Sequence, residues 1–180
     1  MEIRSLDLLE LIKSRRSVKN FLFKKLTPKM IKEILECGRW APSVDNTQPW
    51  RVNIVTHPTV KMMLAELASE YAETFETAAC CFVIFLDLER SKDRIRDILS
   101  IGAFIENLLL AIHSLDKLGA VFITDILSKK EDVNKIFKLS SKNYELMGII
   151  ALGAIDEETD QYKSRKDRKR RNLDDFIDWF

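Results

Sequence analysis

The chain has 180 residues, of which 46% are hydrophobic and 32% are charged, and its formal net charge is +1. These proportions are typical of a globular protein and exclude an intrinsically disordered chain, and the length favours a single domain spanning residues 1–180 with a C-terminal arm at about 156–180. A net charge near zero also excludes a protein that binds polyanions over its whole surface, so nucleic acid is not an expected partner.

Apolar periodicity predicts the elements of the first half of the chain. A helix is expected over residues 5–16 and a second over 28–38, with Thr27 as its N-cap, Pro28 at its first position and Gly38 closing it. An alternating, β-branched segment predicts a strand over 51–56, and residues 58–75 are expected to form one helix. The continuous apolar run at 80–87 is typical of a strand that is buried on both faces.

The longest helical pattern lies within residues 91–119 and predicts a largely buried core helix. Seven residues are expected on its main buried face: Ile95, Ile98, Leu99, Gly102, Ile105, Leu109 and Ile112. A strand over 120–124, a helix over 128–139 and a buried strand over 146–155 follow. Helices on a mixed sheet, in an α+β arrangement, are the predicted fold.

The three cysteines indicate a reducing environment. Cys80 and Cys81 are adjacent in the apolar run, and adjacent residues of a strand point to opposite faces, so they make a poor disulfide pair. They are expected to be buried thiols, and Cys37 is expected on a helix. The sequence shows neither a signal peptide nor an apolar run long enough to span a bilayer, so a cytoplasmic location without a membrane partner is expected.

The residues that usually carry catalysis are missing from recognisable patterns. His57 and His113 are the only histidines, and neither has metal-ligand spacing to a cysteine or carboxylate. The sequence contains neither a nucleophile elbow nor a phosphate-binding glycine loop. No catalytic residue and no metal site are therefore predicted, and an enzyme of this sequence would rely on a bound cofactor for its chemistry.

Two polar stretches could hold such a cofactor. The segment SRRSVKNF offers two arginines, a hydroxyl and Lys19, which suit a phosphate, although a solvated basic helix end is the alternative. The stretch RWAPSVDNTQPWRV offers Ser43, Asn46 and Gln48, which suit a heteroaromatic ring edge or a polyol. Its alternative interpretation is a turn in which these side chains cap the neighbouring backbone.

A third charged stretch lies near the C-terminus. Residues 163–171 carry seven Lys and Arg against one Asp, and residues 1–30 carry eight against three acidic residues. The C-terminal run could be a solvated charge run or a nucleic-acid patch, but it has no interleaved aromatic residues.

Taken together and in this order, these stretches resemble the nitroreductase family of flavoproteins. The resemblance rests on SRRSVKNF, LTPKMIKEILECGRWAPSVDNTQPWRVNIV, IGAFIENLLLAIHSLDKLGAVFI, IIALGAIDEE and KRRNLDDFI, and it covers most of the chain. It implies a mixed β-sheet flanked by helices in an α/β/α sandwich. It also implies a homodimer with two FMN molecules bound at the subunit interface.

The resemblance further implies which residues bind FMN. Arg15, Arg16 and Ser17 match the segment that holds the phosphate and ribityl chain, and Lys19 matches a basic position near the pyrimidine edge. The loop that reaches FMN from the other subunit is matched by Pro42, Ser43, Val44 and Asn46, with Gln48 in the same motif. Arg170 and Arg171 match a basic pair that closes over the phosphate. Val121 and Phe122 belong to the segment 120–124 that passes the ring, where a backbone amide could donate to the flavin, although this sequence departs from the commoner Gly-rich pattern.

The activity implied is that of an FMN-dependent oxidoreductase with ping-pong kinetics. NADH or NADPH would deliver hydride to flavin N5, and a small organic acceptor of the nitroaromatic or quinone type would take the electrons. The alternatives are a related flavoenzyme of the same fold, such as a dehalogenase or dehydrogenase, and a flavin-binding protein without turnover. The short segment LERSKDR before the long helix lacks the insertion that covers the substrate in larger relatives.

Overall fold

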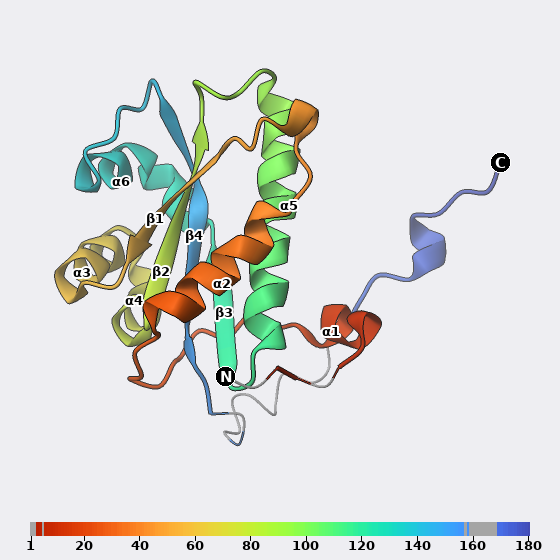
Figure 1. The fold of residues 1–180 in the computed structure, drawn as a ribbon, viewed down its shortest axis with the longest axis horizontal. Coiled ribbons are helices and arrows are strands. Elements are labelled where there is room, and N and C mark those ends of the chain that lie inside the picture. Colours follow the sequence, from red (N-terminus) through yellow and green to blue (C-terminus); the bar gives the residue numbers. More distant parts are fainter. Residues whose placement is uncertain (1–2, 5, 157, 159–168) are drawn as a thin grey trace.

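A sheet of four strands organises the chain. In the computed structural model, which describes residues 3–4, 6–156, 158 and 169–180, the strands are β1 (Trp50–Val55), β2 (Cys80–Asp87), β3 (Leu118–Ile123) and β4 (Tyr144–Ala154). They lie in the order β1-β2-β4-β3 (Figure 1). Each neighbouring pair of strands is antiparallel, and a parallel bridge joins Ser17 to Ala120 at the edge of β3. The predicted α+β class is confirmed.

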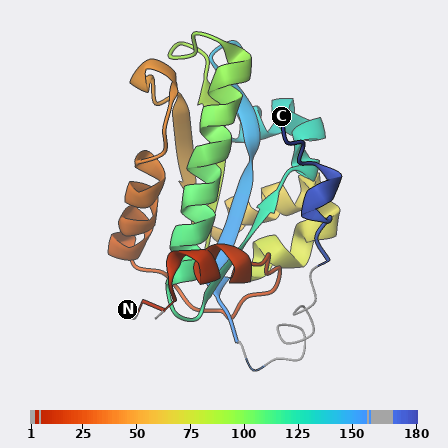
Figure 2. The same cartoon turned by 90° about the vertical axis from the view of Figure 1, so that its right-hand side faces the viewer.

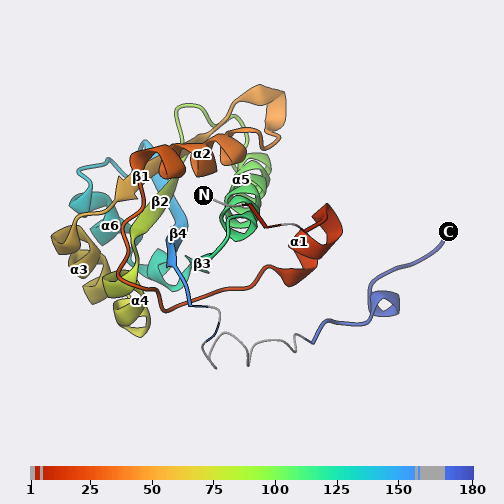
Figure 3. The same ribbon diagram turned by 60° about the horizontal axis from the view of Figure 1, so that its bottom comes forward.

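Helices cover both faces of this sheet. They are α1 (Leu8–Ser14), α2 (Pro28–Arg39), α3 (Pro58–Leu67), α4 (Ala72–Thr77), α5 (Arg94–Ser114) and α6 (Lys130–Ile136). Short 3-10 turns occur at Val44–Asn46, Ser69–Tyr71, Asp125–Lys129 and Leu173–Asp175. Helices α2 and α5 lie on one face, and α3, α4 and α6 lie on the other (Figures 1 and 3). Helix α1 crosses beside the C-terminal end of α5 (Figure 2).

Strand β2 explains why both faces need cover. Its residues from Cys80 to Leu86 are all completely buried, and they alternate between two apolar clusters. Cys80 belongs to the cluster beneath α2 and α5, and Cys81 belongs to the cluster on the opposite face. The predicted opposite orientation of these two thiols is confirmed, and both are free.

Helix α2 begins where the sequence predicts and ends one residue later. The Thr27 side chain accepts a hydrogen bond from the Met30 amide at 3.2 Å, which satisfies one of the open donors of the first turn. Gly38 was expected to close the helix, but it lies inside it and is buried. A Cβ at Gly38 would lie 2.7 Å from Leu108 Cδ2, so glycine is needed there for the close packing of α2 on α5.

One further expectation about the helices is wrong. Residues 58–75 form two helices, because Ala68 leaves the helical conformation (φ −136°, ψ 71°) and the chain folds back into α4. A single helix of that length would extend about 27 Å, whereas the break at Ala68 gives two shorter helices, α3 and α4. Helix α1 ends at Ser14, two residues from the expected end near Arg16, so Arg15 and Arg16 directly follow it. The other boundaries differ from the predicted ones by a few residues, as is usual for element ends.

The buried face of α5 also differs from the predicted one. Ile105, Leu109 and Ile112 are buried as expected, but Ile95 and Leu99 are 73% and 69% exposed, and Gly102 is exposed as well. The helix is apolar on most of its circumference, so periodicity alone could not decide which side meets the sheet. An apolar stripe consequently remains on the outer side of α5.

Candidate functional site

The polar residues singled out from the sequence form two separate groups. We call residues 15–19 the basic segment and residues 42–49 the polar loop. The basic segment follows α1 and runs along the outer edge of β3, and the polar loop joins α2 to β1. Apart from the buried Pro49, the residues of both groups are exposed or half-buried, so both groups remain available to a ligand.

The basic segment is extended because it pairs with β3. Ser17 forms the parallel bridge to Ala120, and the Val18 amide donates to the Ala120 carbonyl at 2.9 Å. Gly119 makes this approach possible, since a Cβ there would lie 3.0 Å from Val18 Cγ2. The pairing fixes the direction of the chain from Arg15 onward.

Arg15 and Arg16 line a small cavity between the basic segment, α5 and β3. The remaining wall residues are Val18, Leu109, His113, Leu118, Gly119, Ala120 and Ile155. Ser14 Oγ and His113 Nε2 share a hydrogen bond at 3.0 Å, and Arg15 Nε lies 3.8 Å from a Glu106 carboxylate oxygen. The cavity has a volume of about 10 Å³, so it could not enclose a phosphate. The guanidinium groups of Arg15 and Arg16 are nevertheless suited to bind such an anionic group at its border.

Lys19 lies further along the same edge. Its ammonium group is 4.3 Å from the centre of the Tyr71 ring, a cation–π contact. The contact joins the basic segment to the turn between α3 and α4, because Tyr71 lies in that turn, 52 positions after Lys19 in the sequence. Sequence reasoning missed Tyr71, because nothing in the local pattern links it to Lys19.

The polar loop is partly organised by its own side chains. Ser43 Oγ accepts from the Gln48 amide at 3.0 Å, and Gln48 Nε2 donates to Asn46 Oδ1 at 3.2 Å. This is the capping that the alternative interpretation of the loop anticipated. Pro42 and Asn46 are nevertheless exposed and Val44 is half-buried, so the loop keeps a surface for a ligand. At its end Trp50 stacks on Phe104, with ring centres 4.8 Å apart.

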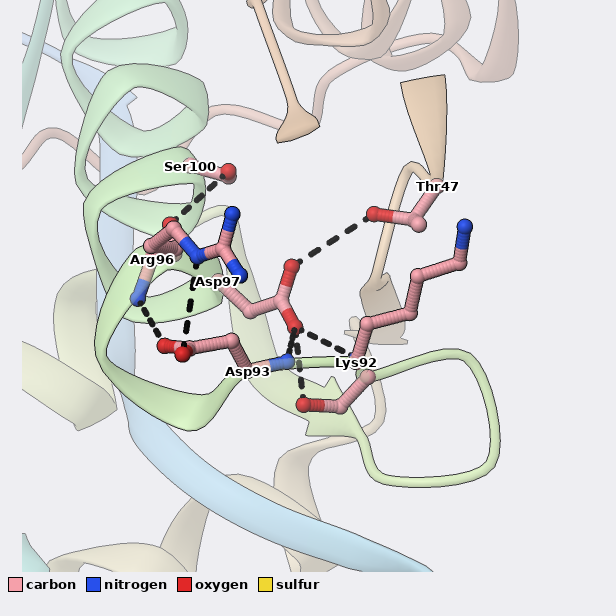
Figure 4. Close-up of polar contacts among 7 residues, drawn as sticks. Thr47, Lys92, Asp93, Arg96, Asp97 and Ser100 are labelled. Carbon is pink, nitrogen blue, oxygen red and sulfur yellow. Dashed lines mark hydrogen bonds and ion pairs between the residues drawn. The ribbon is translucent and has the colours of Figure 1, made fainter. Parts of the chain in front are cut away.

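The N-terminal end of α5 contacts the polar loop through hydrogen bonds. Thr47 Oγ1 donates to the carboxylate of Asp97 at 3.4 Å (Figure 4). Lys92 Nζ also pairs with Asp45 at 3.2 Å. Burial alone would raise the pKa of Asp97. Hydrogen bonds from Ser91 and from the amides of Asp93 and Lys92 outweigh this effect, so the pKa lies below its ordinary value. Asp97 and Thr47 were not among the predicted site residues.

The two groups lie at opposite ends of α5. The polar loop is tied to Asp97 and the cavity of the basic segment is walled by His113. These two residues are sixteen positions apart on the helix, which corresponds to about 24 Å along its axis. Within one chain, the structure does not bring the polar loop and the basic segment together.

The predicted residues of β3 differ in their access to a ligand. The Val121 side chain is 3% exposed and packs in the cluster beneath α3, α4 and α6. Because the Ala120 carbonyl accepts from Val18 at the outer edge, alternation along the strand also directs the backbone groups of Phe122 outward and those of Val121 toward β4. Phe122 is therefore the better placed of the two for a backbone contact.

Arg170 and Arg171 lie in the described C-terminal segment 169–180, all of which is exposed. The Arg171 guanidinium lies 5.2 Å from the Phe176 ring centre and donates to the Asp175 carbonyl, both within this segment. Figures 1 and 3 show the segment away from the sheet and its helices. A convergence of this pair with Arg15 and Arg16 stays a prediction.

Within the described parts of the chain, no group of three or more His, Cys, Asp or Glu side chains could hold a metal ion. Among those same residues, no helix is long and apolar enough to cross a bilayer.

Comparison with known proteins gives these features a context. A sequence profile described as "Nitroreductase family" matches residues 12–154, which include the basic segment, the polar loop and all four strands of the sheet. A protein of Desulfovibrio desulfuricans, assigned as a nitroreductase and solved in complex with FMN, has 26% sequence identity and a TM-score of 0.85. The superposition covers 97% of this chain and 96% of that one.

Two curated proteins resemble part of the chain. YdgI of Bacillus subtilis, assigned as an NAD(P)H nitroreductase, is 34% identical over 90 residues, which are 49% of this chain and 43% of that protein. An NADH dehydrogenase of Thermus thermophilus is 33% identical over 88 residues, which are 49% of this chain and 42% of that protein. The matched part thus spans less than half the length of each of these relatives.

Proposed function

This chain belongs to the nitroreductase family, and from that premise we propose that it is an FMN-dependent oxidoreductase. It takes hydride from NADH or NADPH and passes the electrons to a small organic acceptor, of the nitroaromatic or quinone type, in a ping-pong sequence. The observation that carries this proposal is the combination of the basic segment beside a cavity with the exposed polar loop. Reduced thiols in the core are compatible with a cytoplasmic location.

The residues of the basic segment fit FMN. Arg15 and Arg16 border the same small cavity, and the exposed Ser17 adds a hydroxyl donor, so a dianionic phosphate bound there would receive several charge-assisted bonds. Each such bond contributes about 1.5–3 kcal/mol. Arg170 and Arg171, in the arm at about 156–180, would add positive charge to the same phosphate.

Lys19 would act at the other end of the flavin. Its ammonium group is held over the Tyr71 ring, which limits its movement. A fixed positive charge near the pyrimidine edge stabilises the negative charge that the reduced ring carries, and therefore raises the reduction potential. The outward backbone of Phe122 on β3 lies on the same edge of the sheet and could offer a hydrogen bond to the ring.

The polar loop would serve the flavin of a second copy. Its anchor on α5 is about 24 Å from the cavity of the basic segment, too far for both to enclose one ring system within a single chain. Two copies that pair along the apolar outer stripe of α5, at Ile95 and Leu99, would bring the loop of each to the basic segment of the other. We therefore propose a homodimer with two shared sites, each containing Pro42, Ser43, Val44 and Asn46 from the partner chain.

When bound, FMN supplies a ring that accepts a hydride and releases electrons singly or in pairs. The protein contributes by binding and orienting the ring, by placing positive charge near it and by excluding water through the polar loop. Such a site needs no dedicated acid or base, which agrees with the lack of a recognisable catalytic pattern in the sequence.

The test combines the visible spectrum of the purified protein with a phosphate-site variant. We expect a flavin spectrum, FMN as the released chromophore, and loss of flavin in Arg16→Ala/Arg171→Ala with unchanged circular dichroism. Lys24→Ala/Lys25→Ala is the matched control, because it removes two exposed positive charges outside the site. Full flavin occupancy in the arginine variant would contradict the phosphate assignment.

Rapid mixing with each nicotinamide separates the alternatives. Reduction of the bound flavin by NADH or NADPH supports the proposed oxidoreductase. A flavin that neither nicotinamide reduces would favour a related dehalogenase-like or dehydrogenase-like flavoenzyme, and a flavin without any turnover would indicate a binding protein only.

A further inference from the structure

The polar loop has an unusual backbone. Asp45, Asn46 and Gln48 have φ values of 50°, 55° and 48°, in the left-handed region that non-glycine residues seldom adopt. Asn and Asp tolerate this region better than other residues, but Gln does not share that tolerance. Three such residues within four positions persist only if the surroundings determine the loop conformation, and such strain concentrates at functional sites.

The restraint comes from the connection between β2 and α5 and from the first turns of α5. Arg90 Nη1 donates to the Thr47 carbonyl at 3.2 Å, and the Thr47 hydroxyl donates to Asp97 Oδ1 at 3.4 Å. Lys92 pairs with Asp45 at 3.2 Å, but both side chains are largely exposed, so this pair is the weakest of the three links. Thr47, between Asn46 and Gln48, is thus held through its carbonyl and its hydroxyl.

Asp97 is the buried centre of this arrangement. The residue is 1% exposed, and its Oδ2 accepts from Ser91 Oγ at 2.8 Å, from the Lys92 amide at 2.9 Å and from the Asp93 amide at 3.1 Å. One carboxylate oxygen therefore fixes the connection while the other reaches the loop (Figure 4). A buried carboxylate with all of these donors is rigid, because losing any of them would leave a charge poorly solvated.

Helix capping does not account for Asp97. That role belongs to Asp93, whose side chain accepts from the Arg96 amide at 3.0 Å at the start of α5. Asp97 lies one turn further on, and its acceptors face away from the helix axis toward the connection and the loop. Asp93 therefore caps the helix, whereas Asp97, one turn later, binds the connection and the polar loop.

We propose that Asp97 is a positioning residue for the flavin site: through Thr47 and the connection it holds the strained polar loop in the conformation that contacts the flavin of the partner chain. The inference rests on the proposed function, because it assumes that the loop contacts FMN. Asp97 itself touches neither cofactor nor substrate, and its effect is on the affinity and environment of the bound flavin.

The experiment measures FMN affinity by fluorescence quenching on refolded or flavin-stripped protein, together with the visible spectrum at saturating FMN. Asp97→Ala should raise the dissociation constant by about tenfold to a hundredfold and shift the bound-flavin bands toward those of free FMN. Asp97→Asn should restore most of the affinity, because its amide oxygen can accept from the three donors and its amide nitrogen can donate to Thr47.

Thr47→Val cuts only the link between Asp97 and the loop, and it keeps the shape of the side chain. We expect it to weaken FMN binding by about threefold or more, and the double variant with Asp97→Ala to bind no worse than Asp97→Ala alone, because both changes break one link. Thr27→Ala is the matched control. It removes the N-cap of α2, so the melting temperature should fall while FMN affinity and spectrum stay unchanged.

The outcomes separate this inference from the proposed function. If the wild-type protein binds no FMN, the proposed function fails and this inference fails with it. If the wild-type protein binds FMN and nicotinamide reduces it, but Thr47→Val and Asp97→Ala keep the wild-type affinity and spectrum, only the role of Asp97 is overturned. If Asp97→Ala does not fold, the FMN affinity of Thr47→Val decides alone. Weaker binding supports the role of the Asp97–Thr47 hydrogen bond, and unchanged binding refutes it.

Discussion

Replacing Leu99 by glutamate should separate the two copies that the proposed site requires. Leu99 is 69% exposed on the outer stripe of α5, next to Ile95. Complete burial of a leucine side chain contributes about 1.5–3 kcal/mol, so burying this exposed part contributes about 1–2 kcal/mol per copy. A two-fold interface contains the residue twice, so the substitution removes about 2–4 kcal/mol, before the cost of burying two carboxylates is added.

This loss raises the dimer dissociation constant by about 30-fold to 700-fold, at 1.4 kcal/mol for each factor of ten. Sedimentation velocity across a concentration series measures the constant, and absorbance after desalting measures retained flavin. We expect Leu99→Glu to sediment as a monomer at concentrations where the wild type is dimeric, and to lose flavin with it. Leu99→Met is the control, because it keeps the apolar volume. A Leu99→Glu protein with the wild-type dissociation constant and full flavin would refute the interface and the sharing of the site.

Three other predictions concern the fold. Gly148→Ala should lower stability by about 2–6 kcal/mol, measured by denaturant unfolding, because Gly148 has φ +138° and a Cβ there would lie 2.5 Å from Phe122 Cε2. A thiol reagent should label Cys37 quickly in the native protein and the buried pair only after unfolding, since burial raises the pKa of Cys80 to about 12. The wild type should be more stable than Asp97→Ala by a constant free energy above about pH 4, and this difference should shrink as the pH falls through the lowered pKa of Asp97 in the folded state. The charged neighbours Lys92, Asp93 and Arg96 are present in both proteins, so they do not produce the difference.

Much of the fold could be predicted from the sequence because local signals agree with the tertiary structure. The continuous apolar run of β2 needs cover on both faces, and the cap and proline at Thr27 and Pro28 fix the start of α2. The predicted buried face of α5 was wrong because more than one orientation of this helix on the sheet satisfies its apolar pattern. On α5 the apolar residues surround most of the helix, so the sequence could not show that Leu99 faces outward.

The site divides in the same way. The basic segment and the polar loop are local runs of unusual residues, so the sequence identifies them directly. Lys19 and Tyr71, or Thr47 and Asp97, become partners only through the packing of distant elements. The sequence also gives no reason to single out Asp97, because acidic residues are common near the start of a helix, where they interact favourably with the helix dipole. Only the structure shows that Asp93 already fills the capping position.

The length of α5 connects these observations. The helix has 21 residues, and the polar loop and the basic segment are attached near its two ends. An antiparallel pair of α5 helices that cross at the level of residue 105, less than one turn from Gly102, would place the Asp97 end of one chain level with the His113 end of the other. Gly102 is exposed and a Cβ there would meet nothing within 4 Å, so the outer side of the helix is open for a close approach at this point. The same helix would then set the dimer axis, the distance between the two halves of each site and, through Asp97, the shape of the loop that completes the partner's site.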